Sequence, residues 1–312
     1  MKLINDIKFN LTDEMIDIIL KDRTTNKKLI WATKNYETKG FYENSHITEV
    51  LFSTKYKKII IPRNEKSKAQ QQKRSKDMAE VFTPSWICNK QNNLIDDAWF
   101  NEKDVFNKEE NEKWIPSKKI EFKDKTFIDY INDVRLEITC GEAPYLVSRY
   151  DTVSGDMIEI KDRIGLLDRK LRVVNENTSN EEEWLKYAIL SYKSIYGFDY
   201  QGDNVILSRE NLLYTFIEYF NDRFNKLPTN ESILEILNII SWNIWQMDGI
   251  KLVIPLSCKE EQTQQMSLFG DDEMVMCKGC STGNHKEHNG VRPFIMDWEK
   301  NKRIKYTKLV WG

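Results

Sequence analysis

The sequence lacks a strong excess of either charge. Its 312 residues hold 47 Lys or Arg and 49 Asp or Glu, which gives a formal net charge of −2. A charge so close to zero excludes a global basic field that would draw the protein onto nucleic acid. Any contact with DNA must therefore be local.

Cysteines and long apolar runs are also scarce. Five cysteines in a chain of this length do not make the framework of a small disulfide-rich secreted domain. No apolar run reaches the roughly 20 residues that a membrane span requires. The charged start MKLINDIKFNLTDE has no apolar core of a secretory signal, so we expect a cytoplasmic protein that does not associate with membranes.

By composition the chain divides into three parts. Residues 1–75 form an α+β extension, with a helix in LTDEMIDIILKD, short strands in KLIWAT and KKIIIP, and a basic linker. Residues 76–255 alternate strand and helix patterns, which predicts an α/β domain with a mostly parallel sheet. Residues 256–312 hold a polar loop with Cys and His, followed by two predicted closing strands, FIMDW and KYTKLVW.

The linker RNEKSKAQQQKRSKDM has two interpretations. It is either a solvated, mobile connection or an arm that contacts phosphates, as clustered basic side chains do in nucleic-acid-binding proteins. Its basic residues are Arg63, Lys66, Lys68, Lys73, Arg74 and Lys76.

The stretch LEITCGEAPYLV, Leu136–Val147, predicts a buried strand, a turn that contains glycine, and the start of a helix. A second strand, IYGFDY, ends in Asp199 and precedes the helical segment GDNVILSRENLL. A glycine turn after one strand and an acid at the tip of the next are how a Rossmann-like sheet holds an adenosine cofactor. The backbone approaches the ligand at the turn, and the acid accepts hydrogen bonds from ribose hydroxyls.

Two further motifs flank this pair. EVFTP, Glu80–Pro84, heads one segment, and NIWQMDGIKLVIP places Asp248 just past an apolar strand. Taken singly, Asp199 and Asp248 are equally well explained as caps of the helices or turns after their strands. Cys140, taken singly, is equally well explained as an ordinary core residue. The fixed order of the three motifs is the stronger signal.

This order resembles that of the adenine-specific DNA methyltransferases of restriction–modification systems, whose cofactor motif is close to L-[DE]-P-A-C-G-x-G-x-[FY]-L. The resemblance implies a class I methyltransferase fold, with a Rossmann-like sheet that binds S-adenosylmethionine. The residues that match the cofactor motif are Leu136, Glu137, Cys140, Gly141, Tyr145 and Leu146.

The resemblance also implies roles for residues outside that motif. Phe82, Thr83 and Pro84 would wall the methionine end of the cofactor. Asp199 would bind the ribose. Asp248 would lie beside the adenine ring or at the methyl-transfer centre, which makes it the candidate catalytic residue.

Two departures from the family's pattern bear on function. Ala143 replaces the second glycine of the turn, and a side chain there penalises a left-handed backbone and keeps the backbone away from a ligand. The [DNS]-P-P-[YFW] tetrapeptide, which holds the flipped base in the family, is absent because no two of the seven prolines are adjacent. Either a second polypeptide supplies it, or the fold serves as a non-catalytic module, or another loop replaces it.

These observations lead to two expectations for function. The first is the S-adenosylmethionine-binding subunit or domain of an adenine-specific DNA methyltransferase, which acts on DNA together with a second methyltransferase or specificity subunit. The second is a catalytically inactive, DNA-associated adaptor built on the same fold, recruited through a sliding-clamp-type peptide, QMSLF, or through the zinc loop, both described below.

The loop CKGCSTGNHKEH predicts a metal site. Two thiolates at x₂ spacing chelate one ion from a tight knuckle, and imidazole completes a tetrahedron, for which zinc is the default metal. The alternative is a pair of reduced thiols in a surface loop. Because the ligand set is closed, a structural role is expected. Two sets fit: Cys258, Cys277, Cys280 and His288, or Cys277 and Cys280 with both His285 and His288. The first set is preferred, because the x₂ gap between the two histidines is shorter than the usual x₃ to x₅.

The same loop contains the string QMSLF, which resembles the short peptide by which bacterial polymerases and repair proteins dock into the sliding clamp. In that motif, the residues that match Gln265, Leu268 and Phe269 contact the clamp. The glutamine bonds at the pocket mouth, and the Leu-Phe pair fills an apolar cleft. The alternative is that these side chains anchor the loop onto its own domain.

Overall fold

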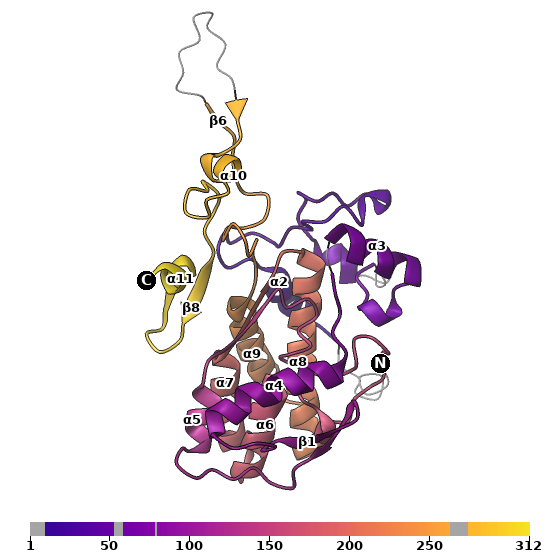
Figure 1. Ribbon diagram of the computed structural model, residues 1–312, viewed down its shortest axis with the longest axis vertical. Coiled ribbons are helices and arrows are strands. Elements are labelled where there is room, and N and C mark those ends of the chain that lie inside the picture. The colour runs from indigo at the N-terminus through magenta and orange to yellow at the C-terminus, as the bar shows by residue number, and fades with distance from the viewer. Residues whose placement is uncertain (1–9, 53–58, 79, 263–273) are drawn as a thin grey trace, which may run out of the picture.

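The structure is a computed structural model that describes residues 10–52, 59–78, 80–262 and 274–312. It is a mixed α/β protein with short sheets (Figure 1). The helices are α2 (Asp13–Leu20), α3 (Lys68–Met78), α4 (Ser85–Phe100), α5 (Phe127–Asn132), α6 (Leu166–Asn177), α7 (Glu181–Lys193), α8 (Gly202–Phe224), α9 (Asn230–Asn243), α10 (Lys278–Thr282) and α11 (Thr307–Trp311). Within the described residues, no helix is both long enough and apolar enough to cross a membrane.

The strands form one three-stranded parallel sheet and three antiparallel pairs. The parallel sheet has the order β3 (Arg135–Ile138), β4 (Ile195–Asp199), β5 (Ile244–Gln246). The antiparallel pairs are β1 (Asn107–Glu110) with β2 (Lys113–Pro116), β6 (Glu261–Gln262) with β7 (Met274–Val275), and β8 (Phe294–Asp297) with β9 (Lys302–Lys305).

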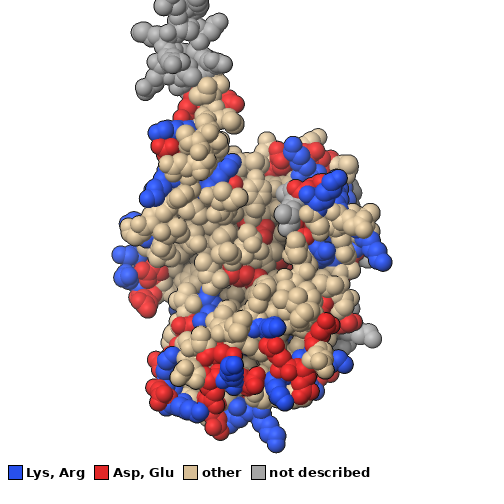
Figure 2. Space-filling model, viewed as in Figure 1, with Lys and Arg blue, Asp and Glu red and all other residues tan. Residues whose placement is uncertain are grey.

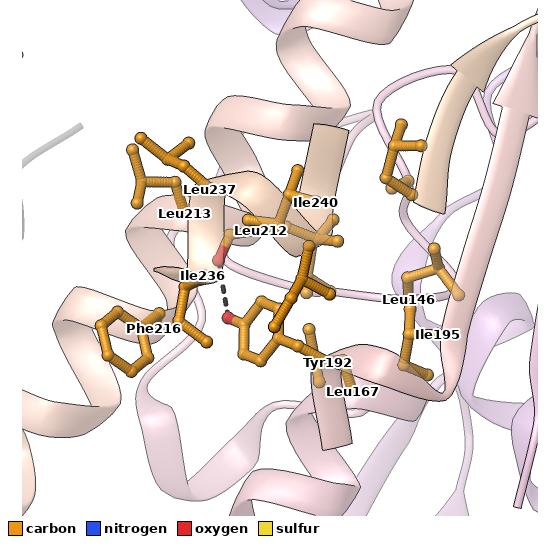
Figure 3. Packing of buried hydrophobic residues seen from close by; sticks show 14 of the residues in the cluster. Leu146, Leu167, Tyr192, Ile195, Leu212, Leu213, Phe216, Ile236, Leu237 and Ile240 are labelled. Atoms are coloured by element: carbon orange, nitrogen blue, oxygen red, sulfur yellow. Dashed lines mark hydrogen bonds between the residues drawn. The ribbon is translucent and has the colours of Figure 1, made fainter. Parts of the chain in front are cut away.

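The main core lies between one face of the parallel sheet and the helices α6 to α9. Ile195 and Ile244 point into this core from β4 and β5 and are fully buried. Tyr192, at the end of α7, packs among apolar side chains of α8 and α9, and its hydroxyl donates to the carbonyl oxygen of Leu212 at 2.7 Å (Figure 3). This packing holds β4 rigidly against the helices, because a well-packed core tolerates little displacement.

The other sheet face is only partly covered. Phe198 and Trp245 point to this face and pack against Ile295 of β8 and Tyr306. Leu136 and Ile138 of β3 share the face, because Leu136 is in register with Tyr196 and Ile138 with Phe198. They remain 42% and 64% exposed, so the prediction of a buried strand is wrong for β3. The predicted helix after this strand is also not found, because residues 139–147 form successive turns.

The N-terminal region belongs to the same core as the sheet. Met15, Ile19 and Trp31 are buried in the main cluster. The predicted strand KLIWAT is reduced to isolated β-bridges, one of which joins Ile30 to His46. The side chain of Gln246 replaces a strand partner here, since it accepts from the backbone N–H of Ile30 at 3.1 Å and donates to the carbonyl of Ile30 at 2.8 Å.

The second half of the basic linker is neither a mobile connection nor a fully exposed arm. Residues 68–78 form helix α3, which lies beside the upper end of α8 in Figure 1. Arg74, on this helix, is 4% exposed. It pairs with Glu80 and, at 2.8 Å, with Asp203 at the start of α8.

The C-terminal prediction is half right. FIMDW contains β8, as expected, and its partner is the antiparallel strand β9, Lys302–Lys305. The rest of KYTKLVW is helix α11 and not a strand. The chain turns at Tyr306, whose backbone N–H bonds to the carbonyl of Pro293, and Tyr306 fills the apolar cluster under the sheet.

Candidate cofactor turn and metal centre

The three strands that carry the sequence motifs end at one edge of the parallel sheet. The turn that contains Gly141 follows β3, and Asp199 is the last residue of β4. The backbone N–H of Gly141 donates to Oδ2 of Asp199 at 3.0 Å. Two residues that lie 58 positions apart in the sequence are therefore in direct contact.

The turn after β3 has three left-handed residues. Thr139, Gly141 and Ala143 have φ of 49°, 54° and 62°. A Cβ atom at Gly141 would have no heavy atom within 4 Å, so the space beside this residue is open. Ala143 adopts the conformation that only glycine takes without cost, and its methyl group is fully buried in the main core. The alanine therefore contributes to packing at the position where the family has its second glycine.

Asp199 is held by the protein's own donors. Its Oδ1 accepts from the backbone N–H of Gln201 at 2.9 Å and from the side-chain amide of Asn204 at 3.2 Å. Burial raises the pKa of Asp199 to about 6, against the lowering effect of the hydrogen bonds from Gln201, Gly141 and Asn204. The carboxylate is oriented and close to its titration point near neutral pH.

Glu137 and Cys140 lie beside this acid. Burial raises the pKa of both side chains well above their usual values. Cys140 is fully buried, with its Sγ 3.6 Å from the hydroxyl oxygen of Ser208. Gly197 on β4 makes room for it, since a Cβ there would lie 3.3 Å from the sulfur. Cys140 is therefore a packing residue of the turn.

The segment of Phe82, Thr83 and Pro84 has no regular secondary structure and leads into α4, where Pro84 is the N-cap. The carbonyl of Thr83 accepts from the hydroxyl of Thr152 at 3.0 Å. The guanidinium of Arg63 lies 4.1 Å from the centre of the Phe82 ring. Because the backbone N–H of Arg63 also donates to Glu142 at 2.6 Å, this segment is joined to the turn that contains Gly141.

Sequence reasoning missed a buried polar network next to the turn. Glu142 is 1% exposed and accepts from the hydroxyl of Tyr150 at 2.6 Å. Asp203 is fully buried and accepts from the hydroxyl of Tyr36 at 2.7 Å and from Arg74 at 2.8 Å. The sequence offered one signal for this network. Glu142 lies inside the glycine turn, where a buried carboxylate needs a hydrogen-bond donor.

Several polar atoms around this edge have unused hydrogen-bonding capacity. Each is buried and has no hydrogen-bond partner among the described residues. Buried polar groups are normally paired, with protein, water or ligand. The atoms are Lys66 Nζ, Glu80 Oε1, Glu137 Oε2, Gln201 Oε1 and Asp203 Oδ1.

Asp248 follows β5, on the far side of β4 from β3. Its Oδ1 accepts from the backbone N–H groups of Ile250 and Lys251, at 3.0 and 2.9 Å, which closes a turn. A hollow of about 210 Å³ also lies beside β5, between the N-terminal region and residues 254–257, and it includes neither Gly141 nor Asp199.

The C-terminal loop brings together four residues that could hold a metal ion such as zinc: Cys258, Cys277, Cys280 and His288. Their ligand atoms lie within 4.8 Å of one another. The three sulfur atoms are 3.7, 3.7 and 3.6 Å from Nδ1 of His288. A tetrahedral zinc ion with ordinary bond lengths separates sulfur and nitrogen ligands by about 3.6 Å, so the spacing fits zinc.

The local sequence explains this geometry. Cys277 is the N-cap of α10, and its sulfur accepts from the backbone N–H of Cys280 at 3.4 Å. Gly279 is required between them, because a Cβ there would collide with the backbone of His288. His285 is exposed and lies against Trp311, with ring centres 5.7 Å apart. The preferred ligand set is the one that converges, and His285 is not part of it.

The predicted clamp-binding residues Gln265, Leu268 and Phe269 lie outside the described residues. Comparison of the chain with protein-family models, curated proteins and solved structures gives no match.

Proposed function

We propose that this chain is the S-adenosylmethionine-binding part of an adenine-specific DNA methyltransferase, completed by another polypeptide segment that holds the target base. The observation that carries the proposal is the contact between Gly141 and Asp199 at the carboxyl edge of a parallel sheet. Ligands of open α/β sheets bind outside the carboxyl ends of the strands.

The surroundings of this contact suit a polar cofactor. Gly141 leaves open space beside its backbone, and its N–H is hydrogen-bonded to the carboxylate of Asp199. The buried atoms without a partner, such as Glu137 Oε2 and Gln201 Oε1, need a donor or a water molecule. An amine, an adenine amino group and ribose hydroxyls together supply such donors.

Each residue or segment at the carboxyl edge of the sheet has a role in cofactor binding. Gly141 admits the cofactor, Asp199 accepts hydrogen bonds from its ribose hydroxyls, and the segment from Phe82 to Pro84 walls its methionine end. Asp248, two strands away from β3, suits the adenine side better than the methyl-transfer centre. When bound, S-adenosylmethionine supplies the methyl group that the amino nitrogen of the flipped adenine accepts.

The uncovered edge of β3 supports the need for a further segment. The backbone N–H of Arg135 donates to the carbonyl of Ser194, so Arg135 and every second residue after it in β3 form their backbone hydrogen bonds with β4. The backbone N–H and C=O groups of Leu136 and Ile138 point the other way, toward the free edge of β3. Parallel strands are normally covered on both faces, and exposed edges normally carry charges or prolines. The apolar row of Val134, Leu136 and Ile138, 65%, 42% and 64% exposed, therefore suits a strand from outside the described residues.

We assign the converging cysteines and His288 to a structural zinc ion. Three thiolates and one imidazole saturate a tetrahedral ion and leave no position for substrate. The loop then has a fixed position beside the sheet, where Lys251 donates to Cys280 Sγ at 3.7 Å.

The test is a calorimetric titration of the chain with S-adenosylmethionine and S-adenosylhomocysteine. Saturable binding is expected, and Asp199→Ala should weaken it at least tenfold, because a hydrogen bond to a charged group contributes about 1.5–3 kcal/mol. Asp297→Ala is the matched control, since Asp297 also ends a strand but bonds to Lys300 at the surface. Asp199→Asn, which preserves the volume, guards against a folding defect.

Two outcomes contradict the proposal. One is the absence of binding at millimolar ligand by a chain whose circular dichroism shows a folded protein. The other is equal affinity of the wild-type chain and a folded Asp199→Ala variant.

The raised pKa of Asp199 predicts how binding depends on pH. Ribose hydroxyls donate hydrogen bonds to the ionised carboxylate of Asp199. The cofactor therefore binds the protein in which Asp199 is deprotonated, and its binding lowers the pKa of Asp199. With a pKa of about 6 in the free protein, the affinity is expected to be constant above about pH 7 and about tenfold lower at pH 5. Titrations near pH 6 in two buffers with different ionisation enthalpies should reveal proton release. A dissociation constant that does not change between pH 5 and pH 7 would contradict this role of Asp199.

A further inference from the structure

The charges of the protein are distributed unevenly. Residues 274–312 hold eight Lys or Arg and three Asp or Glu, whereas residues 1–273 hold 39 Lys or Arg and 46 Asp or Glu. The C-terminal region is therefore basic, although the whole chain is slightly acidic. Several blue side chains, with fewer red ones among them, lie on the part of the molecule in Figure 2 where α10, β8 and α11 lie in Figure 1.

The hairpin of β8 and β9 separates its apolar and basic side chains. Ile295 and Ile304 are directly paired and pack against Phe198 and Trp245. Successive side chains in a strand point to opposite faces, so Arg303 and Lys305 project from the outer face. Both are exposed, and the guanidinium of Arg303 lies 5.1 Å from the ring centre of Phe294, its neighbour on that face.

These cations make no ion pairs within the described part of the chain. Among the described residues, Arg303, Lys305 and Lys308 have no carboxylate within ion-pair distance, whereas Lys300 on the same hairpin pairs with Asp297 at 3.1 Å. Unpaired exposed cations on one face of a two-stranded ribbon cost repulsion energy. That cost is recovered when an extended polyanion binds.

The metal centre holds a second group of cations next to the ribbon. Arg292 donates to the carbonyl of His288 at 3.2 Å and to that of Lys251 at 2.8 Å, so it links the metal loop to the segment after β5. Its guanidinium lies 5.0 Å from the ring centre of Trp311, and the ammonium group of Lys286 lies 5.9 Å from the same ring. The metal loop, the β8–β9 hairpin and α11 thus form one continuous, positively charged region.

We propose that the outer face of the β8–β9 hairpin, with α11 and the metal loop, binds the phosphate backbone of double-stranded DNA. A two-stranded antiparallel ribbon fits the major groove, and basic side chains along its outer face reach the flanking phosphates. The acidic remainder of the chain repels DNA, which orients the duplex onto this side. This surface does not depend on the cofactor site.

The experiment measures fluorescence anisotropy of a labelled 20-bp DNA duplex with the zinc-loaded full chain, in the absence of S-adenosylmethionine. Binding is expected at about 50 mM salt, and it should weaken steeply as salt rises. The double variant Arg303→Ala/Lys305→Ala should bind about tenfold more weakly and reduce the slope of log K against log salt by about 2. Its zinc content and circular dichroism serve as the check that it folds.

Lys118→Ala/Lys119→Ala is the matched control. It removes the same charge from two exposed lysines after β2, and its affinity should equal that of the wild-type chain. Absence of DNA binding by the wild-type chain at low salt would overturn the proposal. Equal weakening by both double variants would also overturn it, because binding would then reflect overall charge and not this face. Failure of S-adenosylmethionine binding would leave this result unaffected.

Discussion

Removal of zinc is expected to unfold the C-terminal region while the helical core remains folded. Cys258, Cys277, Cys280 and His288 come from three separate turns, and among the described residues no large apolar cluster lies inside this loop. Structural zinc contributes roughly 10 kcal/mol or more to the folding of small domains at neutral pH, so the loop depends on the ion. Loss of the loop also loosens the β8–β9 hairpin and exposes Phe198 and Trp245.

Matched histidine variants measure this effect. The purified chain is expected to contain one zinc ion, and His288→Ala should lose it, whereas His285→Ala should retain it because His285 lies against Trp311 outside the ligand group. Chelation should shift the tryptophan fluorescence to longer wavelength and increase amide exchange after residue 254. Retention of zinc by His288→Ala together with its loss from His285→Ala would refute the ligand assignment.

Replacement of Arg209 by alanine is expected to destabilise the whole fold by about 4 kcal/mol, which lowers the melting temperature by roughly 6 °C. Arg209 is 1% exposed and donates only to carbonyl oxygens. Its partners are Ile19, Lys21, Ser241 and Ile244, at 2.6 to 3.0 Å. The side chain therefore ties α2, the end of α9 and β5 together, and its removal takes this donor from four carbonyl groups, three of which are buried.

The matched control for Arg209 is Arg223, on the same helix. Arg223 is exposed and makes one hydrogen bond, to the carbonyl of Thr178 at 3.1 Å. Arg223→Ala should change the free energy of unfolding by less than about 1 kcal/mol. Thermal unfolding followed by circular dichroism compares the two variants. A melting temperature of Arg209→Ala within 2 °C of that of Arg223→Ala would contradict the proposed link between the N-terminal region and the sheet.

Local patterns in the sequence were sufficient for the three strands of the parallel sheet and for the pair of cysteines that begins the metal loop. The stretch around Leu136, the segment before Asp199 and the segment before Asp248 each contain or precede a strand of one parallel sheet. The x₂ spacing of Cys277 and Cys280 determined the knuckle, because α10 begins at that point. These features depend on residues that are neighbours in the chain, so a sequence pattern detects them.

Features that depend on distant residues could not be predicted. Arg74 was assigned to a linker that was interpreted as a solvated connection or a phosphate-binding arm, but its partner Asp203 lies 129 positions further along the chain. Leu136 and Ile138 have the pattern of a buried strand, yet their exposure depends on which element covers that sheet face. The change from strand to helix at Tyr306 also depends on a tertiary contact, the packing of its ring against Phe198 and Trp245.

The most direct test of the central claim is amide hydrogen exchange of the full chain with and without S-adenosylhomocysteine. A cofactor bound beside the turn of Gly141 and at Asp199 should slow exchange in residues 139–143 and 199–204, and leave residues 107–116, in the β1–β2 hairpin, unchanged. Slower exchange in both segments at saturating ligand is the predicted result. No change in either segment, or protection confined to another part of the molecule, would contradict a cofactor site at this edge of the sheet.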